Sequence, residues 1–428
     1  MLRIHGQGNV TKIAEAIRGN LAHLRDYGAA LSGAGGRIVI SLFYFVALAN
    51  ALPVADFGLF ATASATGIML SRIVGFGFTS PLYRAAAVKP LLIGVYGAGY
   101  LLFAALSIPV FLAAALAAHQ LFFAAALPLY TFLLIVSTEA FLWRSLEVIV
   151  IANNGMSRFG KASLLVIVGS MLRAMAAIAF AIIATKSIAN WALWYCAANF
   201  AALIVGILFF TPRARLRLAL PLYRRHISDS LSVAAAEILF YVQSELDKLL
   251  VLALGGAEAA GVYAIIMRLV DLTAIPIRTF NMMLVQKLMR SGDLLNSLKR
   301  RIGLEVGLFT VSTVGIAALA VFLQIFPNAL GKNVAPVTGL LFSVLLVPGF
   351  RNLVEYHAEL LYARRQTVLR AVNLALLAAC KAMLLSFIFM RSSAGTGWLY
   401  DLNWGYGVIW AASLLLTYSA MRHKHKPL

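Results

Sequence analysis

Hydrophobic residues gather along this chain in long stretches that are separated by short polar gaps. One such stretch, LFAALSIPVFLAAALAA, covers residues 102–118 without a single charge. A helix needs roughly 20 mostly apolar residues to cross the hydrocarbon core of a bilayer, and barrel strands are much shorter. The pattern therefore predicts an all-α polytopic membrane protein. The twelve predicted transmembrane helices cover residues 35–52, 58–80, 91–117, 121–145, 163–184, 188–210, 230–254, 259–286, 302–326, 335–360, 368–390 and 398–420.

Lys and Arg residues crowd every second gap between these predicted spans. The N-terminal segment, the even-numbered gaps and the C-terminal tail together hold 25 of the 36 basic residues. The intervening gaps hold only Lys186, Lys332 and Arg391. Because Lys- and Arg-rich connections stay in the cytoplasm, both termini are predicted to be cytoplasmic and the number of spans even.

The composition agrees with this class. Hydrophobic residues make up 62% of the chain, charged residues only 12%, and the mean hydropathy is +0.88. A soluble chain of this length needs far more polar surface. The formal net charge of +20 could indicate a nucleic-acid partner, but the alternation of basic gaps explains it as membrane topology. No nucleic-acid partner is predicted.

No catalytic or metal-binding pattern accompanies the spans. The seven histidines are scattered, and no nucleophile lies at a spacing that pairs it with a base. The predicted outward gaps are short, and the one between the seventh and eighth spans is little more than Gly255–Glu258. The chain is therefore predicted not to be an enzyme and to use no cofactor and no metal.

Three short segments recur in the same order at an offset near half the chain. This repeat predicts two pseudo-symmetric six-helix bundles, residues 34–210 and 229–420, related by an axis along the membrane normal. The matching segments are Asp56–Ala61 with Glu258–Ala264, Arg144–Glu147 with Asn352–Glu355, and Leu172–Met175 with Cys380–Met383.

Three further segments lie outside the predicted bundles. Residues 211–228 form a basic cytoplasmic linker, and residues 421–428 form a basic cytoplasmic tail. The N-terminal cytoplasmic segment, 1–33, carries apolar residues at helical spacing. An amphipathic helix on the cytoplasmic leaflet and a loosely ordered lead-in both explain that spacing.

Sixteen charged residues in or next to the predicted spans are candidates for the membrane interior. A charge at the bilayer centre costs about 2.5–3.5 kcal/mol on insertion scales, so these side chains must pair, snorkel or line a water-filled cavity. The basic residues are Arg72, Arg144, Arg173, Lys248, Arg268, Arg278, Arg351 and Lys381, and the acidic ones are Glu139, Glu147, Glu237, Glu245, Asp247, Asp271, Glu355 and Glu359.

Helical spacing sorts these charges into two kinds. Arg268 and Asp271 lie one turn apart. They can form a structural salt bridge that joins helices, or part of a polar stripe that faces the interior. Arg72, Arg173 and Lys381 have no acid within one turn on their own helices. Polar stripes in both halves indicate a shared polar interior.

Two segments carry a resemblance to a known family. SELDKLLVLALGGAEAAGVYAIIMRLVDLTAIPIRTF, residues 244–280, and ALPVADFGLFATASA, residues 51–65, resemble the polysaccharide-biosynthesis flippases. These are the O-antigen and lipid-linked oligosaccharide exporters of the multidrug/oligosaccharidyl-lipid/polysaccharide (MOP) superfamily. The resemblance implies a bacterial inner-membrane protein that works by alternating access between two bundles around a central cavity.

The resemblance also implies a substrate. A polyprenyl-diphosphate-linked saccharide would move from the cytoplasmic to the outer leaflet for O-antigen, capsule or exopolysaccharide assembly. Membrane lipids and polysaccharide assembly proteins are the other implied partners. The residues implied to hold the diphosphate are Arg72, Arg173, Arg268, Arg278 and Lys381, with Arg144 and Lys248 as further candidates. Those implied to bind a coupling proton or sodium ion, or to tune the cations, are Glu245, Asp247 and Asp271.

Three alternatives stay open. A multidrug or organic-cation antiporter of the same fold should have a cavity dominated by carboxylates. A flippase for the cell-wall lipid precursor shares the diphosphate chemistry. A membrane glycan polymerase or ligase is disfavoured by the short outward gaps and by the missing catalytic pattern.

Overall fold

The computed structural model describes residues 39–290, 297–364, 366–391 and 395–422, and all regular structure within them is helical. The predicted N-terminal segment and the last six residues of the predicted tail lie outside this part. The first half contains the helix Val39–Ala51 and then α2 to α8. Their bounds are α2 (Val54–Leu70), α3 (Thr79–Val88), α4 (Ile93–Ala118), α5 (Leu129–Ser137), α6 (Arg144–Gly155), α7 (Phe159–Ile183) and α8 (Ile188–Val205).

Short 3-10 and π segments extend several of these helices. Pro90–Leu92 leads into α4 and His119–Phe123 continues it, Thr138–Trp143 joins α5 to α6, and Gly206–Phe210 extends α8. A π turn is a local widening of a helix that often accompanies functional sites. Here it lets α5 and α6 form one continuous helical unit.

The second half begins with α9 (Leu220–Arg290), in which Gly256 has φ 79° and interrupts the helix. The hydroxyl of Tyr263 donates to the carboxylate of Asp247, so the two parts of α9 pack side by side as a hairpin. The remaining elements are α10 (Leu298–Ile325), η6 (Pro327–Leu330), α11 (Ala335–Thr338), η7 (Gly339–Val344), α12 (Val347–Ala363), α13 (Thr367–Arg391) and α14 (Trp398–Arg422).

Length and composition identify a multi-pass membrane protein. Six helices in the described part are long and apolar enough to cross a membrane. A bent pair, Ala335–Val344 and Val347–Ala363 at 63°, raises the number to seven. Both parts of α9 count here as one helix, and the first helix and α2 are shorter than the length required. The division into twelve spans stays a prediction.

Two predicted span limits are wrong. The fourth span was expected at 121–145, but α5 and α6 cover 129–155, because the chain turns at 124–128 and Pro128 precedes the new helix. Arg144 and Glu147 consequently lie in the body of the helical unit. The hydrophobic pattern predicts the second span as one helix over 58–80, but turns at 71–78 separate α2 from α3.

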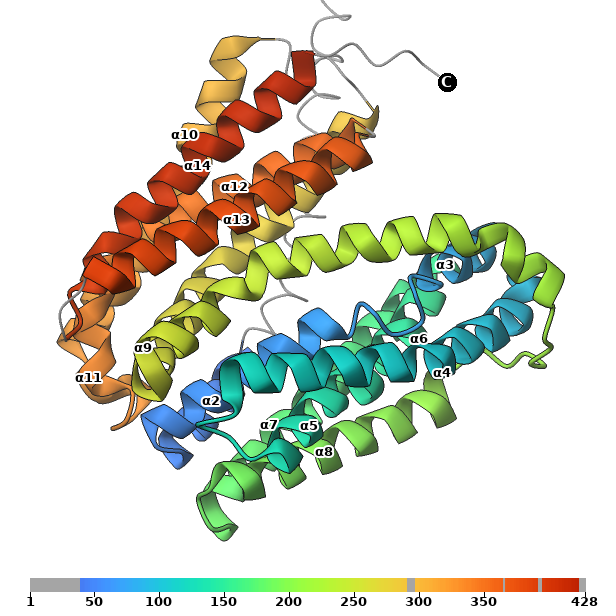
Figure 1. Ribbon diagram of the computed structural model, residues 1–428, viewed down its shortest axis with the longest axis horizontal. Coiled ribbons are helices and arrows are strands. Elements are labelled where there is room, and N and C mark those ends of the chain that lie inside the picture. Colours follow the sequence, from blue (N-terminus) through green and yellow to red (C-terminus); the bar gives the residue numbers. More distant parts are fainter. Residues whose placement is uncertain (1–38, 291–296, 365, 392–394, 423–428) are drawn as a thin grey trace, which may run out of the picture.

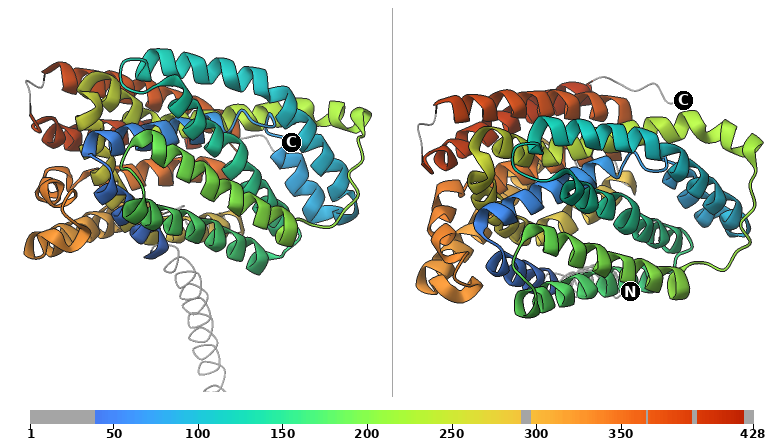
Figure 2. Two further views of the ribbon diagram at one scale, coloured as in Figure 1. Left: turned by 90° about the horizontal axis from the view of Figure 1, so that it is seen from below. Right: turned by 60° about the horizontal axis from the view of Figure 1, so that its bottom comes forward.

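The two halves of the chain occupy different sides of the molecule (Figure 1). α2 to α8 gather on one side and α10 to α14 on the other, and α9 runs between them. Both views in Figure 2 show the beginning of α9, in lime, beside α3 and the start of α4 in blue. The boundaries 34–210, 211–228 and 229–420 and the pseudo-symmetry remain predictions.

Aromatic side chains fill the core of the first half. The Trp191 ring lies 5.6 Å from that of Phe60 and 5.2 Å from that of Phe180. Phe60 also meets Tyr195 edge to face at 5.2 Å. Such tilted aromatic pairs add about 0.5–1.5 kcal/mol each to the burial of their surface. They fix α2, α7 and α8 against one another.

An amide pair joins the two halves at one end of the molecule. The Asn50 side chain donates to the carbonyl oxygen of Leu330 at 2.7 Å and accepts from the backbone N–H of Asn333 at 3.0 Å. The Asn333 amide in turn donates to the carbonyl oxygen of Leu52 at 3.1 Å. These residues border the first and ninth predicted gaps, so this end is the predicted outer one.

Candidate functional site

A cavity of about 970 Å³ lies between the two groups of helices. Its walls come from the turns after α2, from α3 and α6, from the first part of α9, and from α12 and α13. These helix ends adjoin the Lys- and Arg-rich gaps, so the cavity lies toward the predicted cytoplasmic side. Its volume suits an organic ligand, since ligand pockets commonly measure about 300–1,000 Å³.

The lining combines charges of both signs with aromatic rings. Three arginines and three carboxylates are present, together with four aromatic residues. Arginine is suited to planar, bidentate recognition of phosphate, and aromatic rings bind apolar faces of ligands. The charged residues are Arg72, Arg84, Arg370, Asp229, Glu237 and Glu359, and the aromatic ones are Tyr83, Phe240, Tyr241 and Tyr362.

Arg72 enters the cavity because the helix is broken there. Gly75, Phe76 and Gly77 have φ values of 78°, 46° and 71°. A Cβ atom on Gly77 would lie 2.1 Å from the carbonyl oxygen of Ser230, so glycine lets α9 approach. The guanidinium carbon of Arg72 lies 4.1 Å from the centre of the Tyr241 ring. The break therefore turns a buried arginine toward α9.

Arg72 belongs to a charge cluster that ties α6 to α9. Its Nη1 lies 3.2 Å from Oε2 of Glu147. Arg144, which is 3% exposed, lies 3.0 Å from the same carboxylate and 3.2 Å from that of Glu237. Two cations and two carboxylates thus neutralise one another, and Arg144 does not line the large cavity.

Arg173 lies in a separate buried cluster inside the first half. Its Nε donates to Oδ1 of Asn199 at 2.7 Å, and its Nη2 lies 3.5 Å from Oε2 of Glu139. Its guanidinium stacks 3.6 Å from the Trp143 ring centre. Ser64 of α2 donates to Glu139 at 2.6 Å. This cluster holds α2, α7 and α8 together and is absent from the cavity lining.

Lys381 and Asp247 face each other in the second half. Lys381 Nζ lies 3.7 Å from Oδ1 of Asp247 and also donates to the carbonyl oxygen of Gln243. Asp247 accepts hydrogen bonds from Tyr263 and Tyr406, the latter at 3.1 Å. The carboxylate is therefore compensated by an ammonium group of the chain itself.

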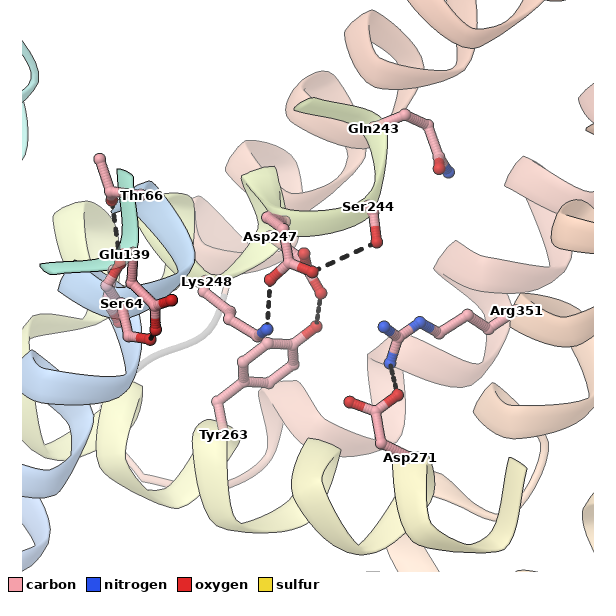
Figure 3. A network of polar contacts seen from close by, with 12 residues as sticks. Ser64, Thr66, Glu139, Gln243, Ser244, Asp247, Lys248, Tyr263, Asp271 and Arg351 are labelled. Atoms are coloured by element: carbon pink, nitrogen blue, oxygen red, sulfur yellow. Dashed lines mark hydrogen bonds and ion pairs between the residues drawn. The ribbon is translucent and has the colours of Figure 1, made fainter. Parts of the chain in front are cut away.

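A third cluster connects the second part of α9 to α12 (Figure 3). Arg278 lies 3.0 Å from Asp271 and 3.0 Å from Glu355. Asp271 is also 3.3 Å from Arg351, and Figure 3 shows these two side chains meeting from neighbouring helices. Lys248 pairs with Glu245 one turn away. Each of the three proposed coupling carboxylates thus has a basic partner.

The structure changes how the predicted site residues are interpreted. Arg72, Arg173 and Lys381 lack an acid only on their own helices, and each lies within 3.7 Å of a carboxylate from another helix. Arg268 instead donates to the hydroxyl of Ser41, and no carboxylate lies within 4.0 Å of it in the described residues. The predicted set therefore falls into several clusters rather than one site.

Sequence reasoning missed two arginines of the cavity. Arg84 pairs with Asp229 at 2.9 Å, and Arg370 pairs with Glu359 at 3.1 Å. Arg370 also lies 5.4 Å from the Phe240 ring centre and 5.2 Å from that of Tyr362. Arg84 lies in a basic gap and Arg370 at the start of the eleventh predicted span, and the sequence pattern counts both as marks of topology. The aromatic residues Tyr83 and Tyr362 near these arginines are the sequence feature that could have indicated a ligand-binding cavity.

Known structures resemble the whole arrangement, although no protein-family model and no curated protein sequence matches the chain. A multidrug resistance MATE family transporter of the MOP superfamily, in an inward-facing conformation, superposes with a TM-score of 0.66 at 12% identity. The alignment covers 91% of this chain and 96% of that one. The chain has the fold of MOP superfamily transporters.

Two further structures share that fold. A MOP superfamily transporter from Pyrococcus furiosus, described as having a binding pocket of reverse polarity, gives a TM-score of 0.60 at 14% identity, over 92% of this chain and 94% of that one. The lipid II flippase MurJ, in an inward closed conformation, gives a TM-score of 0.60 at 13% identity, over 91% of this chain and 87% of that one. At these identities the similarity concerns the fold and leaves the substrate open.

Proposed function

We propose that this protein is an alternating-access flippase for a polyprenyl-diphosphate-linked saccharide in a bacterial inner membrane. The observation that carries the proposal is the shared cavity, into which Arg72 and Arg84 project from the first half and Arg370 from the second. A diphosphate cannot cross hydrocarbon without compensation of its charge. Arginines from both halves can hold it with charge-assisted hydrogen bonds while the lipid tail stays in the bilayer.

The ion pairs of the cavity fit substrate exchange. The Arg84 and Asp229 side chains are 61% and 44% exposed, so their attraction is screened and is worth about 0–1 kcal/mol. A diphosphate can displace Asp229 at little cost. The aromatic rings of Tyr83, Phe240 and Tyr362 offer flat surfaces for sugar rings beside the arginines.

The remaining predicted cations serve other purposes in this proposal. Arg144, Arg173, Arg278 and Lys381 hold helices together through carboxylate partners on other helical segments, and Lys248 pairs with Glu245 within α9. Removing one partner of a buried pair such as Lys381–Asp247 destabilises a protein by about 3–5 kcal/mol. A coupling proton or sodium ion at Glu245, Asp247 or Asp271 would then have to displace a Lys or Arg side chain.

The cavity carboxylates favour a second candidate, an organic-cation antiporter. Asp229, Glu237 and Glu359 equal the three arginines in number, and a cationic ligand would bind the acids instead. A flippase for the cell-wall lipid precursor is a third possibility with the same diphosphate chemistry. These candidates differ in the charge or the saccharide of the ligand, which a reconstituted assay can vary.

Purified protein in liposomes provides that assay. A fluorescent polyprenyl-diphosphate-linked saccharide is placed in the membrane, and its exposure to a membrane-impermeant reagent is followed. The flippase proposal predicts transfer well above the rate in protein-free vesicles. Efflux of an organic cation driven by a proton or sodium gradient, without lipid transfer, would instead support the antiporter. Parallel assays with the cell-wall precursor separate the two flippases.

A further inference from the structure

A second cavity, of about 830 Å³, lies outside the cavity of about 970 Å³, which is called the transport cavity under this proposal, and shares no lining residue with it. Its walls are the segment before α4, the turn between α6 and α7, and the end of α8 with the loop that follows. The first two segments and the end of α8 belong to the first half of the chain, and the loop is the beginning of the predicted linker 211–228. The proposed transport does not involve this cavity.

The charge of this second cavity is of one sign. Five basic side chains line it and no Asp or Glu does. Within the described residues, none of the five has a carboxylate within 4.0 Å, whereas all three arginines of the transport cavity are paired. Closely grouped cations without counter-charges attract anions strongly at a membrane surface. The five residues are Arg158, Lys161, Arg213, Arg215 and Arg217.

The loop that carries three of these arginines is fixed in place. Asn153 donates to the carbonyl oxygen of Phe210 at 2.9 Å, before the loop. Tyr223 donates to the carbonyl oxygens of Val95 at 2.7 Å and Arg217 at 3.2 Å, at its other end. A Cβ atom on Gly94 would lie 2.3 Å from the Arg215 carbonyl oxygen, so the missing side chain lets the loop rest on α4.

Alternate residues of this loop face different surroundings. A Cβ atom on Gly94 would lie 3.1 Å from the side chain of Ala214, and one on Gly97 would lie 3.6 Å from that of Leu216. Arg213, Arg215 and Arg217 line the cavity together with Ala214. Leu216 thus lies beside the helix, while the three arginines reach the cavity.

Exposed apolar side chains complete the lining. Leu91 is 98% exposed, Phe209 73% and Leu208 67%. Side chains of this kind are stable when they contact acyl chains, and cations next to them lie at the level of lipid headgroups. The combination fits a ligand with an anionic head and apolar tails better than a soluble anion.

We propose that this cavity binds the phosphate headgroup of an anionic phospholipid from the predicted cytoplasmic leaflet. The phosphate lies among the five cations, and the acyl chains lie along Leu91, Leu208 and Phe209. The bound lipid joins the loop to the segments at Arg158 and Lys161, and so stabilises the connection between the two halves of the chain. This lipid is a resident ligand and differs from the transported substrate.

Native mass spectrometry and thermal melting of the full-length protein in detergent test this proposal. The lipids are phosphatidylglycerol, cardiolipin and phosphatidylcholine, and inorganic pyrophosphate serves as the soluble anion. The variant Arg213→Gln/Arg215→Gln/Arg217→Gln is compared with Lys89→Gln/Arg224→Gln/Arg225→Gln. The control removes the same charge from exposed positions on the same predicted face that line neither cavity.

The anionic lipids should bind and raise the melting temperature of the wild-type and control proteins, and phosphatidylcholine should not. The loop variant should bind them about 100-fold more weakly, from the usual contribution of a basic residue near an anionic surface. Arg158→Gln/Lys161→Gln, on a different segment, should show a smaller loss. Equal lipid binding by the loop and control variants, or the full thermal shift with pyrophosphate alone, would overturn the proposal.

Discussion

Gly58 of α2 and Gly261 of α9 pack backbone against backbone. A Cβ atom on Gly58 would lie 2.3 Å from the Gly261 nitrogen, and one on Gly261 would lie 2.1 Å from the Val54 carbonyl oxygen. Small residues allow such close helix crossings in membranes. The two glycines also belong to the segments that match each other in the sequence repeat, so related positions of the two halves meet here.

This crossing lies near the Asn50–Asn333 pair, at the predicted outer end, while the cavity of about 970 Å³ lies toward the opposite end. Under the proposed alternating access, the closed end has to open when the cavity closes. The glycine crossing and the amide pair are therefore the contacts that the transport cycle must break or rotate about.

Gly58→Ala should destabilise the protein by about 1–3 kcal/mol or more, because the new methyl group collides with backbone that cannot move aside. Gly307→Ala on α10 is the matched control, since nothing lies within 4 Å of its added methyl group. That variant should be neutral or more stable by about 0.5–1 kcal/mol. Thermal melting in detergent measures both, and equal melting temperatures would contradict the crossing.

Asn50→Cys/Asn333→Cys, made with Cys196 and Cys380 replaced by serine, should form a disulfide on mild oxidation. Asn50 Oδ1 lies 3.0 Å from the Asn333 backbone nitrogen, so the two residues are in direct contact and the pair is a candidate for coupling. The crosslink should stop lipid transfer and a reductant should restore it. Undiminished transfer by the crosslinked protein would show that this end need not open.

Glu139→Gln should lower the melting temperature strongly, since it leaves Arg173, whose side chain is only 17% exposed, without a counter-charge at a cost of about 3–5 kcal/mol. Adding Arg173→Gln should recover part of the loss, because the unpaired charge is then removed. Glu258→Gln, at an exposed position outside the ion pairs of the described residues, is the control. If the double variant were less stable than Glu139→Gln, Arg173 would stabilise the protein through contacts other than its pair with Glu139.

The class of the fold could be predicted from sequence because bilayer thickness dictates long apolar helices, and six such helices are present in the part of the chain that the structure describes. The limits of α5 and α6 could not be predicted. The apolar run continues through the turn at 124–128, and the polar residues Asn153 and Asn154 lie within the helix. Hydropathy records neither the bend before Pro128 nor the buried partner of Asn153, which is the Phe210 carbonyl oxygen.

The candidate charges were found from sequence, but their grouping was not. Arg173 and Glu139 lie 34 residues apart, and Lys381 and Asp247 lie on different helices. Such pairs depend on how helices pack, which a single sequence does not record. Arg84 and Arg370 were missed because the same positive charge marks both a cytoplasmic gap and the edge of a cavity.

The most direct test of the central claim is lipid transfer by Arg72→Gln/Arg84→Gln/Arg370→Gln, reconstituted beside the exposed-charge control Lys89→Gln/Arg224→Gln/Arg225→Gln. If the cavity arginines hold the diphosphate, the first variant should transfer the polyprenyl-diphosphate-linked saccharide at least about ten-fold more slowly, since each lost charge-assisted hydrogen bond is worth about 1.5–3 kcal/mol. The control should transfer it at the wild-type rate. Wild-type transfer by a correctly folded cavity variant would contradict the account.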